Sequence, residues 1–303
     1  MAHVLVVGYL SIDSLQAVGA APVELPGGAA LYAALGARHA GAQASIAAAV
    51  GEDYPQPWLQ ALAELGIDVS YVQRRPGPTR RTVLRYQGSG QRDSLHYRDA
   101  IWWQRTQALA PTLPDPLRQI DVLVACPMPI TNLAALLRRA ALASVPVVAD
   151  TSEAFVNEDP QRLLQLVSEM AAFAPSREET RRLWPLREDD DSASALASLG
   201  VNLLHKRGAE GALALSAHGA ASLRIPAPPT TVVDPTGAGD ATVGALAALM
   251  GGGADFLHAA AAALVTGAQA TTATGPAALG LATHFNPQSN EFPVQGLHGV
   301  PRN

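Results

Sequence analysis

The segment Val233-Asp234-Pro235-Thr236-Gly237-Ala238-Gly239-Asp240 ends an apolar, β-branched run and precedes an Ala-rich helical pattern. A turn of small residues at the start of a helix presents unpaired backbone N–H groups, which together with the helix dipole favour an anion. A carboxylate beside a bound phosphate, as at Asp240, can accept the proton of an attacking hydroxyl. The alternative is an ordinary turn in which Asp240 caps the helix. The whole string, between a strand and a long helix, favours phosphate chemistry.

Two common phosphate-binding motifs are excluded by the residues themselves. Lys206 is the only lysine in the chain, and the Gly-Lys-Ser/Thr sequence of a Walker-type loop is therefore missing. A dinucleotide-binding fingerprint needs a third glycine after Gly237 and Gly239, and the residue at that position is Thr242. These two phosphate-binding folds are therefore disfavoured by the residues alone.

Short apolar runs alternate with helical patterns along the chain, which predicts an α/β protein with a buried, mostly parallel sheet. The predicted strands are Val4–Val7, Ser45–Val50, Val122–Ala125, Val145–Ala149, Ala171–Ala174, Leu203–Lys206 and Ala212–Leu215. The predicted helices are Gly28–Ala40, Pro57–Leu65, Leu133–Ala143, Arg162–Glu169, Ser192–Leu199, Gly239–Met250 and Phe256–Thr271. Active sites lie at the carboxyl ends of such strands, where we expect Asp13, the Gly27-Gly28 turn and the 234–240 loop.

Two half-polar segments, Leu10–Val23 and Thr79–Tyr97, predict strands outside the main sheet, with a turn at Gln87–Gly90. The second segment and the residues after it are rich in arginine and aromatic residues, including Arg85 and Tyr97. Two interpretations stay open. One is a clamp for a polyhydroxylated or anionic substrate with Arg85 and Tyr97 as contacts, and the other is a charged edge that discourages aggregation.

Composition agrees with a soluble enzyme and adds little beyond that. At 303 residues, of which 48% are hydrophobic, the chain is long enough for one large α/β domain or two smaller ones. A net charge of −5 argues against a nucleic-acid partner. The apolar runs are too short for a signal peptide or a membrane helix, so we expect no membrane partner. The single cysteine, Cys126, excludes an intrachain disulfide and a Cys-based metal site, and the cytoplasm is the expected compartment.

The 234–240 segment matches the pattern Asp-x-x-Gly-Ala-Gly-Asp and so resembles the signature of the PfkB, or ribokinase-like, family of small-molecule kinases. Further matches follow in family order at Val4–Gly8 with Asp13, Pro26–Ala30, Val50–Asp53, Gly66–Val69 and Lys206–Gly211. The resemblance implies a central, mostly parallel sheet flanked by helices, with a small β lid over the substrate. It also implies a kinase domain at 1–285 with lid segments at about 10–25 and 78–103, followed by a tail at 286–303.

The resemblance assigns roles to residues of the acceptor and phosphoryl sites. Asp240 is expected to be the general base, and Gly237, Ala238 and Gly239 are expected to bind the transferred phosphoryl group. Asp13, Gly27 and Gly28 are expected to bind the acceptor. Tyr32 stands where many sugar kinases of the family have Asn, which offers an aromatic wall and is more similar to the inositol-kinase branch.

The resemblance also assigns residues that contact the nucleotide and its cations. The residues expected to contact ATP are Ser176, Lys206, Gly208, Gly211 and Thr236. In the Asn-x-x-Glu motif of the family, Glu179 matches and Ser176 replaces Asn, which implies Mg²⁺ held by Glu179 through water. The alternative is that Glu178 or Glu179 caps or flanks the helix that begins there. Asp234 matches the carboxylate that holds a monovalent cation, K⁺, in members of this type.

These residues predict an ATP- and magnesium-dependent kinase that phosphorylates a hydroxyl of a small polyol, sugar or inositol. One alternative is a nucleoside kinase of the same fold. The other is a catalytically silent ribokinase-like protein that binds a ligand, against which the intact Asp240 argues. A homodimer formed through the lid is compatible with all three.

Overall fold

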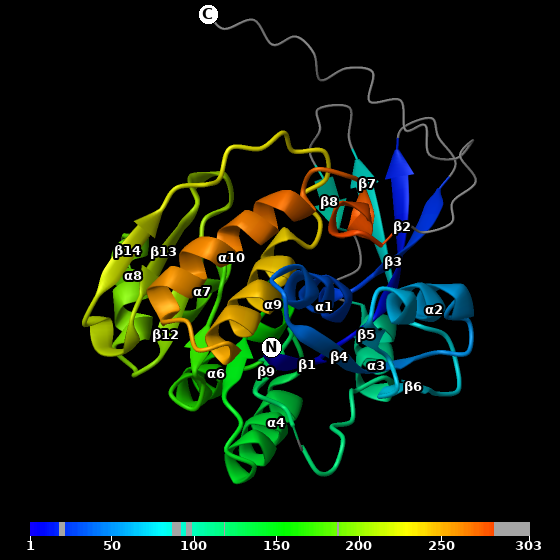
Figure 1. The fold of residues 1–303 in the computed structure, drawn as a ribbon, viewed down its shortest axis with the longest axis horizontal. Helices are drawn as coiled ribbons and strands as arrows, with labels where there is room; N and C mark the ends of the chain where they lie inside the picture. Colours follow the sequence, from blue (N-terminus) through cyan, green and yellow to red (C-terminus); the bar gives the residue numbers. More distant parts are fainter. Residues whose placement is uncertain (18–21, 87–91, 95–98, 118, 187, 282–303) are drawn as a thin grey trace, which may run out of the picture.

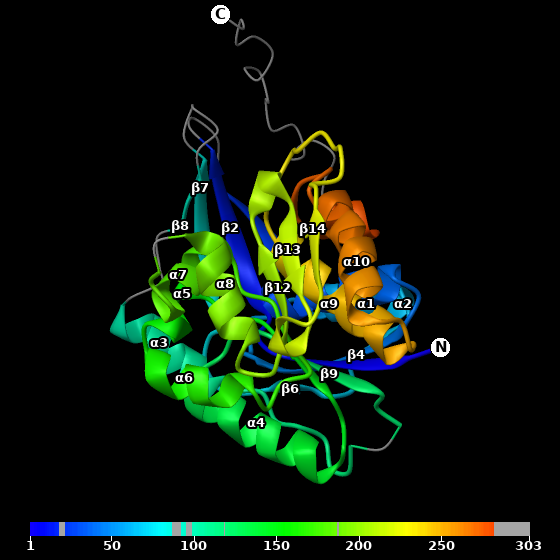
Figure 2. The same ribbon diagram turned by 90° about the vertical axis from the view of Figure 1, so that its left-hand side faces the viewer.

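A large sheet lies between two layers of helices in the computed structural model, which describes residues 1–17, 22–86, 92–94, 99–117, 119–186 and 188–281 (Figures 1 and 2). The strand order is β14-β13-β12-β11-β10-β9-β1-β4-β5, and β6 pairs with the end of β4. The bounds are β1 (His3–Val7), β4 (Gln43–Val50), β5 (Ile67–Asp68), β6 (Val72–Arg74), β9 (Val122–Ala125), β10 (Val147–Ala149), β11 (Ala172–Phe173), β12 (Asn202–Lys206), β13 (Ala212–Leu215) and β14 (Ser222–Ile225). Pairing is parallel from β5 to β12 and antiparallel at β13 and β14, which confirms the predicted α/β fold with a mostly parallel sheet.

Alternate residues of β1 face opposite layers, as the pleat of a strand requires. Val4 and Val6 belong to one buried core, and Leu5 and Val7 belong to the other. The helices on the first core are α1 (Ala29–His39), α2 (Gln56–Glu64), α9 (Ala238–Gly251) and α10 (Phe256–Ala270). Those on the second core are α4 (Ile130–Leu142), α5 (Glu153–Val156), α6 (Pro160–Val167), α7 (Arg177–Leu183) and α8 (Asp189–Ala197). Across the described residues, no helix combines the length and apolar character needed to cross a membrane.

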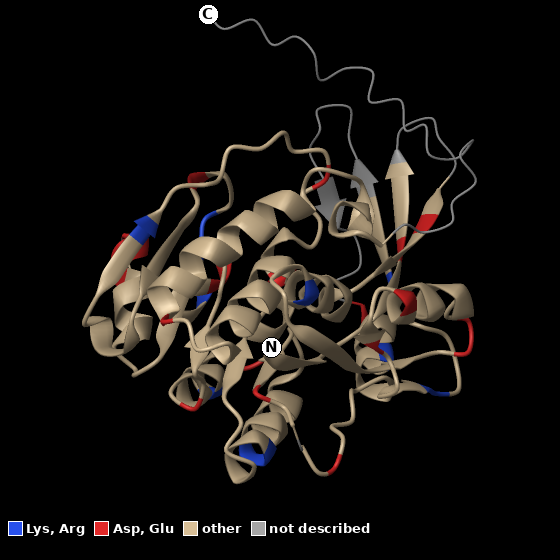
Figure 3. Cartoon of the chain, in the orientation of Figure 1, with Lys and Arg blue, Asp and Glu red and all other residues tan. Residues whose placement is uncertain are grey.

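Helices α1 and α9 pack closely, and glycine makes this contact possible. A Cβ on Gly36 would overlap the carbonyl of Ala241, and a Cβ on Gly244 would overlap the carbonyl of Ala33. Helix α10 carries no acidic or basic residue except His258, and Asp240 is the only acidic or basic residue of α9 (Figure 3). The close packing therefore holds the start of α9, with its single carboxylate, against α1.

A second, four-stranded sheet has the order β3-β2-β7-β8 and projects from the main sheet, which agrees with the predicted lid strands (Figures 1 and 2). Its strands are β2 (Ser11–Ala17), β3 (Val23–Gly27), β7 (Arg81–Tyr86) and β8 (Arg92–Ser94). The predicted second lid segment ends differently, because residues 100–103 begin helix α3 (Ala100–Ala108), whose first turn is capped by Asp99 accepting from the N–H of Trp102 at 2.6 Å. The turn at 87–90, Tyr97 and the tail at 286–303 lie outside the described residues. The homodimer through the lid stays a prediction.

The Val50–Asp53 motif fastens the start of the second lid segment to the main domain. The Gly51 N–H donates to the hydroxyl of Thr79 at 3.0 Å, and the Thr79 N–H donates to the Asp53 carboxylate at 2.7 Å. Arg81, the first residue of β7, donates to the same carboxylate at 2.9 Å. Thr79 is fully buried, so this motif sets the place at which the lid leaves the domain.

Candidate active site

A cavity of about 920 Å³ opens beyond the carboxyl ends of β1, β10 and β12, beside the start of α9. It brings together most of the residues that the sequence predicted for the site. Those that line it are Asp13, Gly28, Tyr32, Ser176, Glu179, Lys206, Gly208, Gly211, Thr236, Gly237, Ala238, Gly239 and Asp240. Gly27 and Asp234 do not line the cavity, but each contacts a residue that does. Gly27 lies against Asp13, and Asp234 accepts a hydrogen bond from Thr236.

The predicted anion loop has the expected form of a small-residue turn at a helix N-terminus. Gly237 is the N-terminal cap of α9 with φ 74°, a left-handed conformation that favours glycine. A Cβ at this position would also overlap the ring of Tyr32, so the aromatic residue lies directly against the loop. The Thr242 hydroxyl donates to the Ala238 carbonyl at 2.8 Å within the first turns of the helix. The loop is thereby fixed between α1 and α9.

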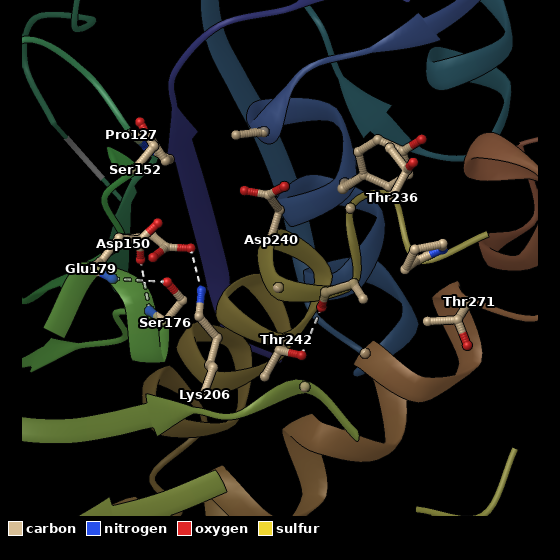
Figure 4. A pocket seen from close by; sticks show the side chains of 18 of the residues that line it. Pro127, Asp150, Ser152, Ser176, Glu179, Lys206, Thr236, Asp240, Thr242 and Thr271 are labelled. Carbon is tan, nitrogen blue, oxygen red and sulfur yellow. Dashed lines mark hydrogen bonds and ion pairs between the residues drawn. The ribbon is translucent and has the colours of Figure 1, made fainter. Parts of the chain in front are cut away.

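Asp240 lies in the first turn of α9 and faces the cavity (Figure 4). Burial raises the pKa of its carboxyl to about 7, the negative charge of Asp150 adds to that rise, and Lys206 opposes it. A general base works best when its pKa lies near the working pH. The site therefore gives Asp240 the proton affinity that the predicted role needs.

Asp150 is a site residue that the sequence reasoning missed. It follows β10 and is 6% exposed, and its carboxylate accepts a 2.6 Å hydrogen bond from the Nζ of Lys206 at the end of β12 (Figure 4). The Thr151 N–H donates to its other oxygen at 2.8 Å. The available signal was its position directly after a buried strand, at the edge of the sheet where active sites lie.

Ser176 and Glu179 form a capping box at the start of α7. The Ser176 N–H donates to the Glu179 carboxylate at 2.7 Å, and the Glu179 N–H donates to the Ser176 hydroxyl at 3.3 Å. Burial raises the pKa of Glu179 to about 7, and the charge of Asp150 contributes to the rise. The two residues thus cap a helix and also line the cavity, beside a second carboxylate.

The Gly27-Gly28 turn packs closely against other parts of the protein, and its binding of the acceptor stays a prediction. A Cβ on Gly27 would overlap the Asp13 carboxylate, and one on Gly28 would overlap the Tyr9 carbonyl. The glycines therefore make room for the protein's own groups. Asp13 is 6% exposed and accepts a 2.7 Å hydrogen bond from the Ser11 hydroxyl, so its carboxylate is held at the cavity wall.

Aromatic side chains and Arg80 form the wall near Asp13, and Arg80 and Trp102 come from the segment for which a substrate clamp is one interpretation. The Arg80 guanidinium lies 4.2 Å from the ring centroid of Tyr9 and 4.8 Å from that of Trp102. Trp102 in turn lies 5.8 Å from Phe155 between ring centroids, and all four residues line the cavity. The arginine and tryptophan content of the second lid segment was the available signal.

The two lid residues predicted to contact the substrate are not tested by the structure. Arg85 belongs to β7, but its side chain lies outside the described part of the chain, as does the whole of Tyr97. Their contact with the substrate stays a prediction. Three described residues at the start of this lid segment, Arg80, Thr82 and Leu84, do line the cavity.

Asp234 ties two loops together beneath the anion loop. One carboxylate oxygen accepts from the N–H of Thr236 at 3.0 Å and from its hydroxyl at 2.6 Å. The other oxygen accepts from the N–H of Gly275 at 2.9 Å. Asp234 is 2% exposed, so a buried negative charge lies where the 234–240 loop meets the 271–275 segment.

Comparison with known proteins agrees with this geometry. Residues 1–283 match the family described as pfkB family carbohydrate kinases. A cytidine kinase of Thermococcus kodakarensis is 30% identical over 250 residues, covering 80% of this chain and 87% of the relative.

Solved structures share the fold across nearly the whole chain. The aminoimidazole riboside kinase of Salmonella enterica, solved with aminoimidazole riboside and an ATP analogue, is 25% identical with a TM-score of 0.72, covering 91% of this chain and 96% of that one. A proposed ribokinase II of E. coli, solved with ATP and Mg²⁺, is 21% identical with a TM-score of 0.74, covering 91% of this chain and 94% of that one. The chain belongs to the pfkB family of carbohydrate kinases and is an ATP-dependent kinase.

Proposed function

We propose that this kinase transfers the γ-phosphate of ATP to a hydroxyl of a nucleoside. The observation that carries the proposal is the acceptor side of the cavity, where Asp13 shares the wall with Tyr9, Arg80 and Trp102. A carboxylate accepts hydrogen bonds from ribose hydroxyls, whereas aromatic rings and guanidinium planes stack on bases. The names of the cytidine kinase and the aminoimidazole riboside kinase, which both refer to nucleosides, support this choice.

A small polyol, sugar or inositol is the second candidate acceptor. Asp13 and the adjacent Ser11 offer contacts to any pair of hydroxyls, and the family description refers to carbohydrates. These acceptors carry no base, so they would make no use of the aromatic part of the wall. The nucleoside uses both parts of the acceptor side and is therefore preferred.

The transfer itself follows from the groups around the anion loop. The acceptor oxygen forms a bond to the γ-phosphorus as the bond from that phosphorus to the bridging oxygen breaks, and ADP leaves with the bonding electrons. Asp240 takes the proton of the acceptor hydroxyl and later releases it to solvent. The N–H groups of Gly237, Ala238 and Gly239 stabilise the charge on the moving phosphoryl group. Ser176, Lys206, Gly208, Gly211 and Thr236 are proposed to contact the nucleotide, since all five line the cavity.

Magnesium fits the oxygen-rich side of the cavity. Ser176, Glu179 and Asp150 line it together, and hydroxyl and carboxylate oxygens are what Mg²⁺ and its water shell prefer. We propose that Glu179 holds the ion through water, with Ser176 beside it. Mg²⁺ bound there supplies positive charge to the nucleotide phosphates.

A panel of acceptors tests the proposal. Formation of phosphorylated product and of ADP would be measured with Mg²⁺ for cytidine, uridine, adenosine, inosine, ribose and myo-inositol. We expect the best nucleoside to exceed ribose and myo-inositol in kcat/KM by at least about tenfold, because the base contacts add binding energy. A higher kcat/KM for ribose or myo-inositol would replace the nucleoside with the second candidate.

The pH dependence of the reaction is predicted by the raised pKa of Asp240, which is about 7. Only the deprotonated carboxylate can take the acceptor proton, so kcat/KM should fall as pH drops below about 7 and level off above it. The measurement is kcat/KM from about pH 5.5 to 9, fitted for an acid-limb pKa. A flat profile down to about pH 5.5 would contradict the assignment of Asp240 as the titrating base.

A monovalent cation at Asp234 is a further expectation that activity measurements can test. The carboxylate lies where the 234–240 loop meets Gly275, and a buried cation there would add positive charge beside the anion loop. We expect the rate to fall several-fold when K⁺ is replaced by tetramethylammonium at constant ionic strength. An unchanged rate would show that the hydrogen bonds of Asp234 are sufficient without a cation.

A further inference from the structure

The only lysine of the chain lies in the active site. Lys206 is one of 21 lysine and arginine residues, and all the others are arginine. It is the last residue of β12, its side chain is 16% exposed, and it lines the same cavity as Asp240. A single lysine among so many arginines suggests that this position needs the compact ammonium group, which differs from guanidinium in size and geometry.

On one side, the ammonium group is held by a buried carboxylate. Lys206 Nζ donates to Asp150 at 2.6 Å, and the side chain of Asp150 is 5% exposed. The Thr151 N–H fixes the other carboxylate oxygen at 2.8 Å. Burial by itself lowers the pKa of Lys206, but the charges of Asp150 and Glu179 outweigh this effect and leave the pKa raised. Lys206 is therefore protonated. It can donate hydrogen bonds and supply positive charge, but it cannot act as a base.

On its other side, the same ammonium group faces the anion loop. A Cβ added to Gly239 would lie 3.2 Å from Lys206 Nζ, so the nitrogen occupies the space next to the main chain of this loop. Figure 4 shows Lys206 rising from β12 to Asp150, with Asp240 across the same space. Glycine at 239 leaves room for the ammonium group, and the larger planar guanidinium of an arginine would need more space.

We propose that Lys206 contacts the phosphoryl group during transfer and that Asp150 is a positioning residue that aims it there. The inference rests on the proposed kinase reaction and adds one contact to it. As the γ-phosphorus moves from the bridging oxygen of ATP to the acceptor oxygen, the Nζ–H groups donate to its equatorial oxygens. Lys206 keeps its proton throughout, and the acceptor proton goes to Asp240 as before. The ammonium thus adds a charged donor beside the N–H groups at the start of α9.

The competing explanation is that Lys206 only neutralises Asp150 as a structural ion pair. Breaking a buried pair by removing one partner is strongly destabilising, whereas replacing both partners is often tolerated. The variants Lys206→Met, Asp150→Asn and the double variant therefore separate the two explanations. Arg182→Met serves as a matched control, because Arg182 pairs with Glu153 at 2.7 Å on the surface and neither residue lines the cavity.

We expect Lys206→Met to lower both the thermal stability and, by about 10²–10³-fold, the kcat. The double variant should regain the lost thermal stability but not the lost kcat. We also expect its kcat to be no lower than that of Lys206→Met, because Asp150 acts through Lys206. Arg182→Met should keep the wild-type kcat. A double variant with near wild-type kcat would overturn the contact, and losses that multiply would overturn the positioning role of Asp150.

The single lysine also allows a direct spectroscopic test without catalysis. Protein labelled with [ε-¹³C]lysine, made without lysine in any tag, gives one Cε signal. We expect this signal to shift more with Mg²⁺ and a non-hydrolysable ATP analogue than with ADP, and to shift least with AMP. Equal shifts with ADP and the ATP analogue would overturn the proposed contact, whatever the acceptor.

The two proposals fail in different ways. A γ-phosphate-dependent shift together with no nucleoside turnover would remove the nucleoside from the proposed function but leave the Lys206 contact intact. Strong nucleoside turnover with a Cε signal that does not respond to the γ-phosphate would keep the nucleoside in the proposed function but overturn the Lys206 contact.

Discussion

Replacing Asp240 by asparagine should lower kcat by about 10²–10⁴-fold and leave the affinity for ATP nearly unchanged. Asparagine has the same shape but cannot take the acceptor proton. The carboxyl lies in the first turn of α9, beside the loop whose N–H groups are proposed to bind the phosphoryl group, and its pKa of about 7 suits proton transfer near neutral pH. Steady-state kcat and a separate titration with a non-hydrolysable ATP analogue measure the two quantities.

A control carboxylate distinguishes lost chemistry from a general change of charge. Asp191 is an exposed residue of α8 that does not line the cavity, so Asp191→Asn should retain the wild-type kcat. If Asp240→Asn turned over substrate as fast as the Asp191→Asn control, the general base would have to be another residue. Asp150, which lines the same cavity, would be the next candidate.

The main sheet could be predicted because its strands carry a strong local signal. β1 and β9 are short runs rich in valine and leucine, and a helix follows β9 in the alternating order that a parallel sheet requires. Helix α3 gave no such signal, since its apolar residues Ile101, Trp102 and Trp103 are consecutive and do not form a helical stripe. The cap at Asp99 and the contact of Trp102 with Phe155 stabilise it, and the second is a tertiary contact that sequence periodicity does not contain.

The edge strand β14 illustrates the same limit. Three of its four residues are exposed, so it lacks the buried run that identified the other strands. Its antiparallel pairing with β13 holds it in the sheet. Pairing with a neighbour is a long-range property, and a short polar edge strand depends on it almost entirely.

The candidate site was predictable where its residues are consecutive in the chain. The 234–240 segment carries its own helix start, loop and carboxylate, so a local pattern was enough. Asp150 and Lys206 are separate in sequence and meet only because β10 and β12 flank β11 in the sheet. The reason for glycine at position 27 was also hidden, because it depends on the place of the Asp13 carboxylate across the β2–β3 pair.

Replacing Asp13 by alanine should raise the acceptor KM by at least about tenfold and change the affinity for ATP little, because each hydroxyl left without a partner costs about 1–3 kcal/mol. Asp13→Ala should also increase ADP formation relative to phosphorylated product, since a loosely held acceptor lets water compete. The matched control is Ser14→Ala: Ser14 is the next residue of β2, faces the opposite side of that strand and does not line the cavity. Acceptor and ATP titrations on both variants decide the orientation of the two ligands, because a variant that weakens ATP and spares the acceptor would place the nucleotide at Asp13.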